Sequence, residues 1–266
     1  MKSQIHEFNI AKSSVTNRPV KQVYSNYTEH DFLVWKTLFN RQMEILKPIA
    51  SAEYLDALRQ VKFSSEKIPD FGEVAELLKP LTGWSIHTVP SISPQKEFFE
   101  FLSQKKFTST CWLRTMEQLD YLEEPDMFHD VFAHVPLLSN RQYVNFFKGL
   151  SDIALKHIDD PHAVELLGRI YWFTIEFGLI IENDEIKVYG AGILSSKGEA
   201  VFCMDKKALL IEFDVDLVLH TDFRTDVIQD KYFVIESFDQ LYNSLPEIEL
   251  LLEKELEETK RSELCY

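Results

Sequence analysis

The spacing of apolar positions predicts that most of this chain is helical. From Thr28, apolar side chains recur at intervals of three and four residues, as they do on one face of an α-helix, until Pro48 stops the pattern. Thr28 followed by Asp31 resembles a capping box with a shortened acid, which marks the start of this first helix. The same period predicts further helices over residues 51–61, 70–78, 143–155 and 163–180, and one that contains Phe98, Phe99 and Phe101.

Alternation of apolar and polar residues predicts only short strands, over residues 84–89, 185–189, 199–203 and 232–236, with 107–114 as strand or extended chain. Residues 117–124 form a polar loop. Gly190, Ala191 and Gly192 form a small-residue loop, where glycine serves either a turn or the close approach of a ligand. We therefore expect a mainly α fold with a small β component (α+β).

The chain shows no internal repeat and no break in composition, so we expect a single domain over residues 24–245. Residues 1–23 are polar without a periodic apolar face and are predicted to form an N-terminal tail. Residues 246–266 are predicted to form an acidic C-terminal helix or tail that is solvated, because its apolar face is too short for sustained heptads.

Composition and charge restrict the possible partners. The 266 residues are 45% hydrophobic, which is typical of a globular protein with a sizeable core, and the net charge of −15 disfavours nucleic acid and anionic membranes as partners. The three cysteines lie far apart without CxxC spacing, so a reducing cytoplasm is expected. The N-terminus carries no apolar signal region, and residues 170–181 are too short an apolar stretch to span a bilayer.

Two histidines within PDMFHDVFAHVPLL are the first candidates for chemistry. Imidazole is the commonest protein metal ligand, but the five-residue spacing of His129 and His134 corresponds to about 140° of rotation on an α-helix, so the pair does not share one face. Both side chains reach one ion if His134 lies in a distorted last turn, which Pro136 favours. A pair of helical core histidines without a metal is an equally good interpretation of this segment alone.

Glu176 is the second candidate, because it is the only carboxylate in the apolar run YWFTIEFGLII. A buried carboxylate is costly unless it is protonated, hydrogen-bonded, paired or bound to a metal. Trp172 lies one helical turn earlier and would place an aromatic surface beside it, which suggests an aromatic ligand. Two histidines and one carboxylate from separate segments are the ligand set of a facial triad on non-haem Fe(II).

These residues stand within several longer motifs that resemble one family. The segments YTEHDFLVWKTLFNRQ, IPDFGEVAELLKPLTGW, EQLDYLEEPDMFHDVFAHVPLL, YWFTIEFGLI, YGAGILSSKGE and YFVIESF occur in the order typical of the pterin-dependent aromatic amino acid hydroxylases. The resemblance extends over residues 27–238 and is closest to the bacterial phenylalanine 4-monooxygenases.

The resemblance implies a role for each candidate residue. His129, His134 and Glu176 would be catalytic iron ligands, with Asp126 orienting a ligand. Arg114 would bind the carboxylate of the amino acid, and the substrate ring would lie near Trp172, with Phe177, Gly192 and Ser195 completing the pocket. The tetrahydropterin would stack on Phe98, with further contacts from Ser91, Ser93, Gln95, Asp130 and Tyr171.

The implied activity is conversion of L-phenylalanine to L-tyrosine with O2, Fe(II) and a tetrahydropterin such as tetrahydrobiopterin. Hydroxylation of tryptophan or tyrosine is the nearest alternative, although Trp172 favours phenylalanine or tyrosine in the family pattern, and a zinc-dependent hydrolase is an alternative of another class. Leu122 and Asp130 replace residues of the animal members and fit the bacterial pattern. With no regulatory domain or long coiled coil expected, a monomer is the first expectation and a dimer the second.

Overall fold

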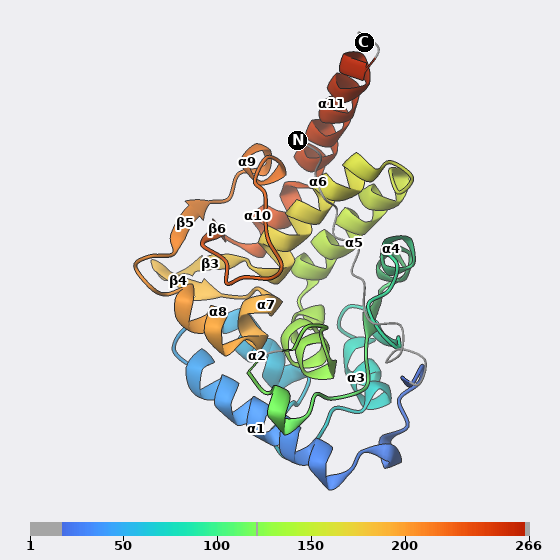
Figure 1. Ribbon diagram of the computed structural model, residues 1–266, viewed down its shortest axis with the longest axis vertical. Coiled ribbons are helices and arrows are strands. Elements are labelled where there is room, and N and C mark those ends of the chain that lie inside the picture. Colours follow the sequence, from blue (N-terminus) through green and yellow to red (C-terminus); the bar gives the residue numbers. More distant parts are fainter. Residues whose placement is uncertain (1–17, 121, 264–266) are drawn as a thin grey trace.

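The structure, a computed structural model, describes residues 18–120 and 122–263 (Figure 1). Residues 1–17 of the tail expected over residues 1–23 therefore lie outside the described residues. From residue 18 the chain contacts the domain. The Gln22 side chain donates to the Pro69 carbonyl at 2.9 Å and accepts from the Phe71 amide at 2.8 Å.

Helices dominate the described chain, as the apolar period predicted. In chain order they are α1 (Glu29–Leu46), α2 (Ala52–Gln60), α3 (Phe71–Leu78), α4 (Gln95–Ser103), α5 (Arg141–Lys156), α6 (Pro161–Tyr171), α7 (Ala191–Ser195), α8 (Lys197–Phe202), α9 (Val215–Leu219), α10 (Phe238–Asn243) and α11 (Leu245–Glu263). Two π-helical segments, η4 (Phe128–His134) and η6 (Trp172–Glu176), interrupt this regular pattern. Short 3₁₀ turns form η2 (Tyr24–Asn26), η3 (Met116–Gln118) and η5 (Pro136–Ser139).

The predicted helix starts are confirmed by their caps. Thr28 and Asp31 form the capping box of α1, in which the Thr28 amide donates to Asp31 at 2.7 Å and the Asp31 amide donates to Thr28 Oγ1 at 3.3 Å. Ser51 and Asp70 cap α2 and α3 through their side chains. Because each cap satisfies amide groups that lack a partner inside the helix, these boundaries are determined locally.

Two small sheets make up the β component. Strands β1 (Ser85–Thr88) and β2 (Lys106–Ser109) pair in parallel. The second sheet has the order β4-β3-β6-β5, in which β3 (Leu179–Glu182) and β4 (Glu185–Val188) form a hairpin and β6 (Lys231–Ile235) lies parallel to both β3 and β5 (Leu209–Glu212).

Three sequence expectations differ from this arrangement. The helix expected over residues 163–180 ends at Glu176, and the chain enters β3 at Leu179, because the π-helical turn and Gly178 redirect it. The strand expected over 199–203 is wrong, since Ser196 caps α8 there. The loop expected over 190–192 instead opens α7.

Aromatic packing holds η4 against α1. The Trp35 ring contacts Phe128 edge to face at a centroid distance of 5.5 Å, and Phe128 stacks on Phe132 at 4.7 Å. All three side chains are fully buried, and the indole N–H of Trp35 donates to the Ser64 carbonyl at 2.9 Å. Such rings each bury a large apolar area, so this cluster fixes the position of the π-helical segment.

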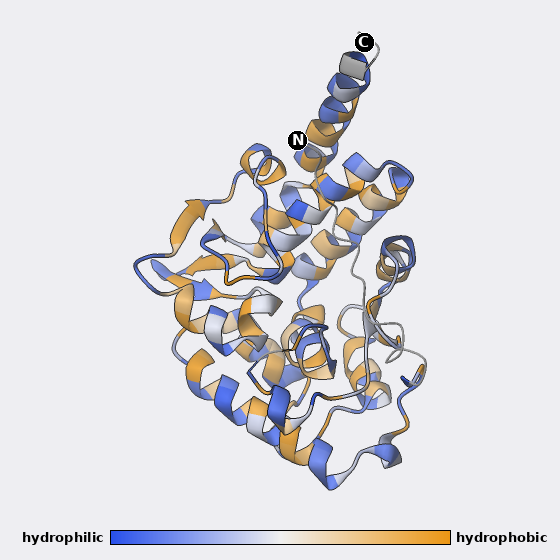
Figure 2. Ribbon diagram, viewed as in Figure 1, coloured by the Kyte–Doolittle hydropathy of each residue, from blue (hydrophilic) through white to orange (hydrophobic). Residues whose placement is uncertain are grey.

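The C-terminal helix α11 is only partly solvated. Ile248, Leu252 and Leu256 are buried, and α11 packs on α5, α6 and α9 before its far end extends away from the rest of the molecule (Figure 1). Figure 2 shows hydrophobic and hydrophilic residues mixed along α11, as expected for an amphipathic helix. Within the described ranges, no helix is both long and apolar enough to cross a membrane.

Candidate metal centre

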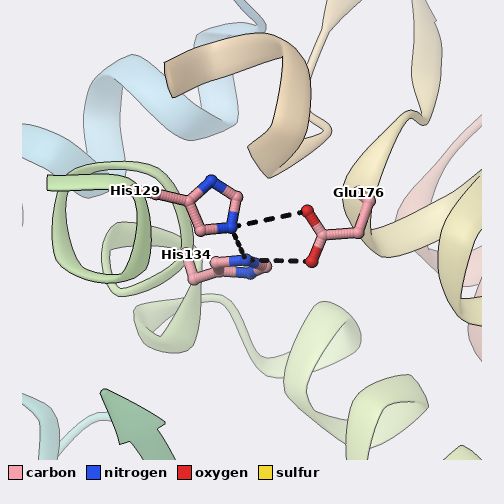
Figure 3. A group of neighbouring side chains, drawn as sticks. All are labelled: His129, His134 and Glu176. Carbon is pink, nitrogen blue, oxygen red and sulfur yellow. Dashed lines mark hydrogen bonds and ion pairs between the residues drawn. The ribbon is translucent and has the colours of Figure 1, made fainter. Parts of the chain in front are cut away.

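Three ligand-type side chains converge between the two π-helical segments (Figure 3). His134 Nε2 lies 3.2 Å from Glu176 Oε1, His129 Nε2 lies 3.7 Å from Glu176 Oε2, and the two Nε2 atoms are 3.3 Å apart. Among the described residues, no second group of three His, Cys, Asp or Glu side chains comes together in this way. Two ring nitrogens and a carboxylate therefore surround a single point.

The π-helical geometry explains how histidines five residues apart meet. In a π-helix the hydrogen bonds join residues i and i+5, so these two positions lie above one another. The expected distortion at His134 is present, but it extends through the whole of Phe128–His134, and Pro136 only begins the following 3₁₀ turn. In the second π-helical segment, the Phe177 amide donates to the Trp172 carbonyl at 2.9 Å, and Glu176 is the last residue of this turn.

Ser195 determines which nitrogen of His129 is free. Its hydroxyl lies 2.8 Å from His129 Nδ1 and donates its own proton to the Ala191 carbonyl at 2.9 Å. The hydroxyl oxygen must then accept from an Nδ1–H, which leaves the Nε2 lone pair directed at Glu176 and His134. The resemblance placed Ser195 in the substrate pocket, whereas in this structure it orients an imidazole.

We predict that Ser195→Ala weakens iron binding by about 10- to 100-fold, the range found when a hydrogen-bonding partner of a ligand is lost. The iron content after dialysis against a graded chelator measures this change. Ser103→Ala is the matched control, because the Ser103 hydroxyl bonds only the Glu100 carbonyl of its own helix. Equal iron retention by both variants would refute the orienting role.

The charge state of the three residues suits a divalent cation. Burial lowers the pKa of His129 to about 4 against the opposing effect of Glu176, so the ring is neutral at pH 7. Burial alone would raise the pKa of Glu176, but His134, His129 and the Tyr171 hydroxyl outweigh it and hold the pKa at about 2. Two imidazole nitrogens and one carboxylate are the donor set of non-haem Fe(II) sites with open positions, so the residues fit iron.

Asp126 holds Arg114 rather than an imidazole. It is fully buried and accepts from Arg114 Nε at 2.9 Å and from Nη2 at 2.7 Å. It also accepts from the backbone amides of Arg114 at 2.9 Å and His129 at 3.3 Å. The contact of Asp126 with His129 is therefore to the backbone amide, and its role in orienting an iron ligand stays a prediction. Asp126 engages Nε and one N–H of Nη2, so the two N–H groups of Nη1 and the second N–H of Nη2 are the donors left for an anion.

Trp172 and Phe177 form an aromatic wall next to Glu176. Their ring centroids are 4.6 Å apart. The Phe223 ring stacks on the Trp172 indole, with a centroid distance of 4.6 Å and an interplanar angle of 19°. A Cβ at Gly192 would lie 2.6 Å from the Phe177 ring. A residue without a side chain is therefore required at position 192. The sequence left open whether this glycine serves a turn or a ligand contact, and in the structure it allows Phe177 to pack closely against α7.

Comparisons with known proteins agree with this site. The model of the biopterin-dependent aromatic amino acid hydroxylase family matches residues 3–259. This chain belongs to that family. It is 39% identical over 226 residues to the phenylalanine-4-hydroxylase of Chromobacterium violaceum, covering 84% of this chain and 75% of the relative. The phenylalanine-4-hydroxylase of Ralstonia nicotianae is 41% identical over 226 residues, covering 85% and 72%.

Solved structures give the same result. The Chromobacterium violaceum phenylalanine hydroxylase with bound iron(III) and 7,8-dihydrobiopterin is similar to this hydroxylase at a TM-score of 0.83 and 38% identity. The match covers 89% of this chain and 86% of that one. The fold predicted from sequence, a mainly α domain of the aromatic amino acid hydroxylase type, is thereby confirmed, as are iron and a pterin as the cofactors of the family.

The residues expected to bind the pterin lie in two groups. Phe98 on α4 meets Tyr171 edge to face at 5.7 Å, and the Tyr171 hydroxyl hydrogen-bonds Glu176, so Phe98 connects to the metal centre through one side chain. Asp130 accepts from the Thr110 amide at 2.8 Å and its hydroxyl at 3.1 Å, while burial raises the Asp130 pKa to about 7.

The second group precedes α4. Ser91 and Ser93 are half-buried, and Gln95 is exposed as the first residue of α4. The Ile92 amide donates to Glu124 Oε1 at 3.3 Å, and Glu124 also pairs with Arg18. Sequence analysis gave no role to Glu124, because a glutamate in a polar loop carries no signal of burial. The contact ties this loop to the segment that leads into Asp126.

The close approach at Gly192 leads to a prediction about stability. Gly192→Ala should lower the free energy of unfolding by about 1–3 kcal/mol, because the added methyl group overpacks against the Phe177 ring. Gly168→Ala on α6 is the matched control, since nothing lies within 4 Å of its Cβ position, and it should raise stability by about 0.5–1 kcal/mol. Urea unfolding of both variants measures the two signs, and a stabilised Gly192→Ala would contradict the packing argument.

Proposed function

We propose that this hydroxylase converts L-phenylalanine to L-tyrosine with O2 and a tetrahydropterin at an Fe(II) ion held by His129, His134 and Glu176. The observation that carries the proposal is the convergence of the two imidazole Nε2 atoms and the Glu176 carboxylate, which lie 3.2–3.7 Å from one another. The phenylalanine-4-hydroxylases among the relatives support the substrate. The zinc-dependent hydrolase is not favoured, because the chain belongs to the biopterin-dependent hydroxylase family.

When bound, iron and the reduced pterin supply the electrons that activate oxygen. The side chains of this chain control geometry. Ser195 keeps His129 Nε2 unprotonated, and the Tyr171 hydroxyl restrains the Glu176 carboxylate through a hydrogen bond. His129, His134 and Glu176 would hold the iron and would leave its other positions for exchangeable groups.

Arg114 and the aromatic wall position the amino acid. Asp126 holds the guanidinium in place, so that Nη1 binds the substrate carboxylate without first losing side-chain freedom. Trp172 and Phe177 pack against the ring and exclude water from that side. Fixing both ends of a small substrate orients one ring carbon toward the metal, which is the main contribution a protein makes in such chemistry. On the pterin side, Phe98 offers a stacking surface next to Tyr171.

Product analysis tests this proposal. Fe(II)-loaded protein is given oxygen, a tetrahydropterin and, in separate reactions, L-phenylalanine, L-tyrosine or L-tryptophan, with zinc-loaded protein as the control. Tyrosine from phenylalanine as the dominant product is the expected result. A dominant hydroxylated tryptophan or tyrosine would keep the metal centre and overturn the substrate, and no product from any amino acid would overturn the activity.

We also propose that the hydroxylase acts as a cytoplasmic monomer on small molecules only. The net charge of −15 disfavours binding to nucleic acid or to anionic membranes, and Cys111 and Cys203 are both buried free thiols. Light scattering coupled to gel filtration measures the mass in solution. A mass of twice 31.1 kDa would replace the monomer with the dimer.

A further inference from the structure

One buried polar side chain outside the metal centre is tied directly to the aromatic wall. Gln229 is 5% exposed, although it lies in an irregular segment, residues 221–230, whose other described residues are half-buried or exposed. Its Oε1 accepts the indole N–H of Trp172 at 3.0 Å. Burying an amide is costly unless its donors and acceptors are paired, so this position needs an explanation.

Every polar group of the Gln229 side chain is engaged, and the pattern fixes its orientation. Nε2 donates to the Arg224 carbonyl at 2.8 Å and to the Val227 carbonyl at 2.9 Å. The reverse orientation would place the amide oxygen against two carbonyls and the NH₂ group against the indole N–H. Oε1 therefore has to face Trp172. The same bonds close the loop that follows Phe223, the ring stacked on Trp172.

The backbone of Gln229 is anchored to rigid elements. Its amide donates to Glu199 Oε1 at 3.0 Å, and the Tyr232 hydroxyl donates to Glu199 Oε2 at 2.7 Å. Glu199 lies on α8, Tyr232 on β6, and both side chains are buried. A buried network in which each member is satisfied rigidifies its surroundings, so the indole nitrogen is connected to a helix and a sheet strand through one glutamine.

We propose that Gln229 is a positioning residue that holds the Trp172 indole against the aromatic ring of the amino acid and thereby determines which ring carbon is hydroxylated. The inference rests on the proposed function, because it assigns Trp172 to the wall of that substrate site. Gln229 acts through Trp172, because the hydrogen bond from the indole N–H joins the network to the aromatic wall.

The test is Gln229→Leu, which keeps side-chain bulk but cannot accept the indole proton. KM for phenylalanine should rise about five- to tenfold, as for the loss of one neutral hydrogen bond, while kcat changes less than about threefold. The share of 3-hydroxyphenylalanine among the products should rise, and tyrosine formed per pterin oxidised should fall. Iron content should stay at the parent level.

A double-mutant cycle shows whether the effect passes through the indole. Trp172→Phe removes the N–H from the other end of the same bond and should change KM and the product ratio in the same direction. In that background, Gln229→Leu should add less than about a twofold change, since residues that act through one contact are not additive. If the effects of the two substitutions on KM and product ratio were fully additive, the proposal would be overturned. If Gln229→Leu does not fold, the KM and product ratio of Trp172→Phe are the test.

Gln240→Leu is the matched control, because Gln240 Oε1 accepts the Glu236 amide at 2.7 Å and contacts no part of the site. Equal KM and product ratios for the two glutamine variants would overturn the inference. If the parent protein makes no tyrosine, the proposed function has failed. If the parent makes tyrosine and Gln229→Leu behaves like the parent, only the positioning role has failed. The ¹⁵N–¹H signal of the Trp172 indole, which should lose hydrogen-exchange protection in Gln229→Leu, reports on the bond independently of turnover.

Discussion

Glu176→Ala is expected to lose iron and, with it, tyrosine formation. The substitution removes the only carboxylate of the three residues and leaves two imidazole nitrogens 3.3 Å apart. Loss of an outer partner of a metal ligand already weakens binding by about 10- to 100-fold, so loss of the ligand itself should exceed 100-fold. Iron content after gel filtration and tyrosine formation under saturating pterin are the two measurements.

Glu185→Ala is the control for this variant, because Glu185 is an exposed glutamate on β4 that pairs only with Lys187. It should retain iron and activity. Full iron occupancy in Glu176→Ala would contradict the assignment of the carboxylate as a ligand, whatever happened to turnover.

The second large effect is expected at Arg114. Arg114→Leu should keep iron but lower kcat/KM for phenylalanine by roughly 10- to 150-fold, which corresponds to about 1.5–3 kcal/mol for hydrogen bonds to a charged group. It should also lower the free energy of unfolding by about 3 kcal/mol, because the buried Asp126 carboxylate loses its partner. Steady-state kinetics and urea unfolding measure the two effects.

The double variant Arg114→Leu with Asp126→Asn separates binding from stability. The asparagine is neutral, and its single amide oxygen can still accept from one of the two backbone amides, so part of the lost stability should return. The kinetic defect should remain, because the guanidinium is still missing. Recovery of kcat/KM together with stability would show that Arg114 serves the fold and not the substrate.

Local signals made much of the fold predictable. The starts of α1, α2 and α3 depend on Thr28, Ser51 and Asp70, whose side chains bond amides within three residues, so the sequence alone contains the cause. The chain over 199–203 depends on its surroundings instead. Its few residues fit both the helical and the strand pattern of apolar positions. Glu199 is buried because the Tyr232 hydroxyl and the Gln229 amide, from a distant segment, donate hydrogen bonds to its carboxylate.

The candidate site was predictable as a set of residues but less so as a set of contacts. An isolated carboxylate in an apolar run identifies Glu176 without any structure, because burial has to be compensated. The partners of Ser195 and Asp126 depend on how α7 and the chain near Arg114 pack, which no spacing encodes. The π-helical turns were missed because apolar periodicity distinguishes helix from strand and not one helical hydrogen-bond pattern from another.

The π-helical segment also limits how this chain can diverge. Substitutions keep His129 and His134 five residues apart. Deletion of one residue between them would leave them four residues apart, the spacing at which two side chains share one face of an ordinary α-helix. That deletion would rotate the chain on one side of the gap by about 100° relative to the other, so Phe128 and Phe132 could not both keep their contacts with Trp35 and Phe39. Descendants of this sequence are therefore free to exchange side chains around the ligands but not to change the length of the segment that carries them.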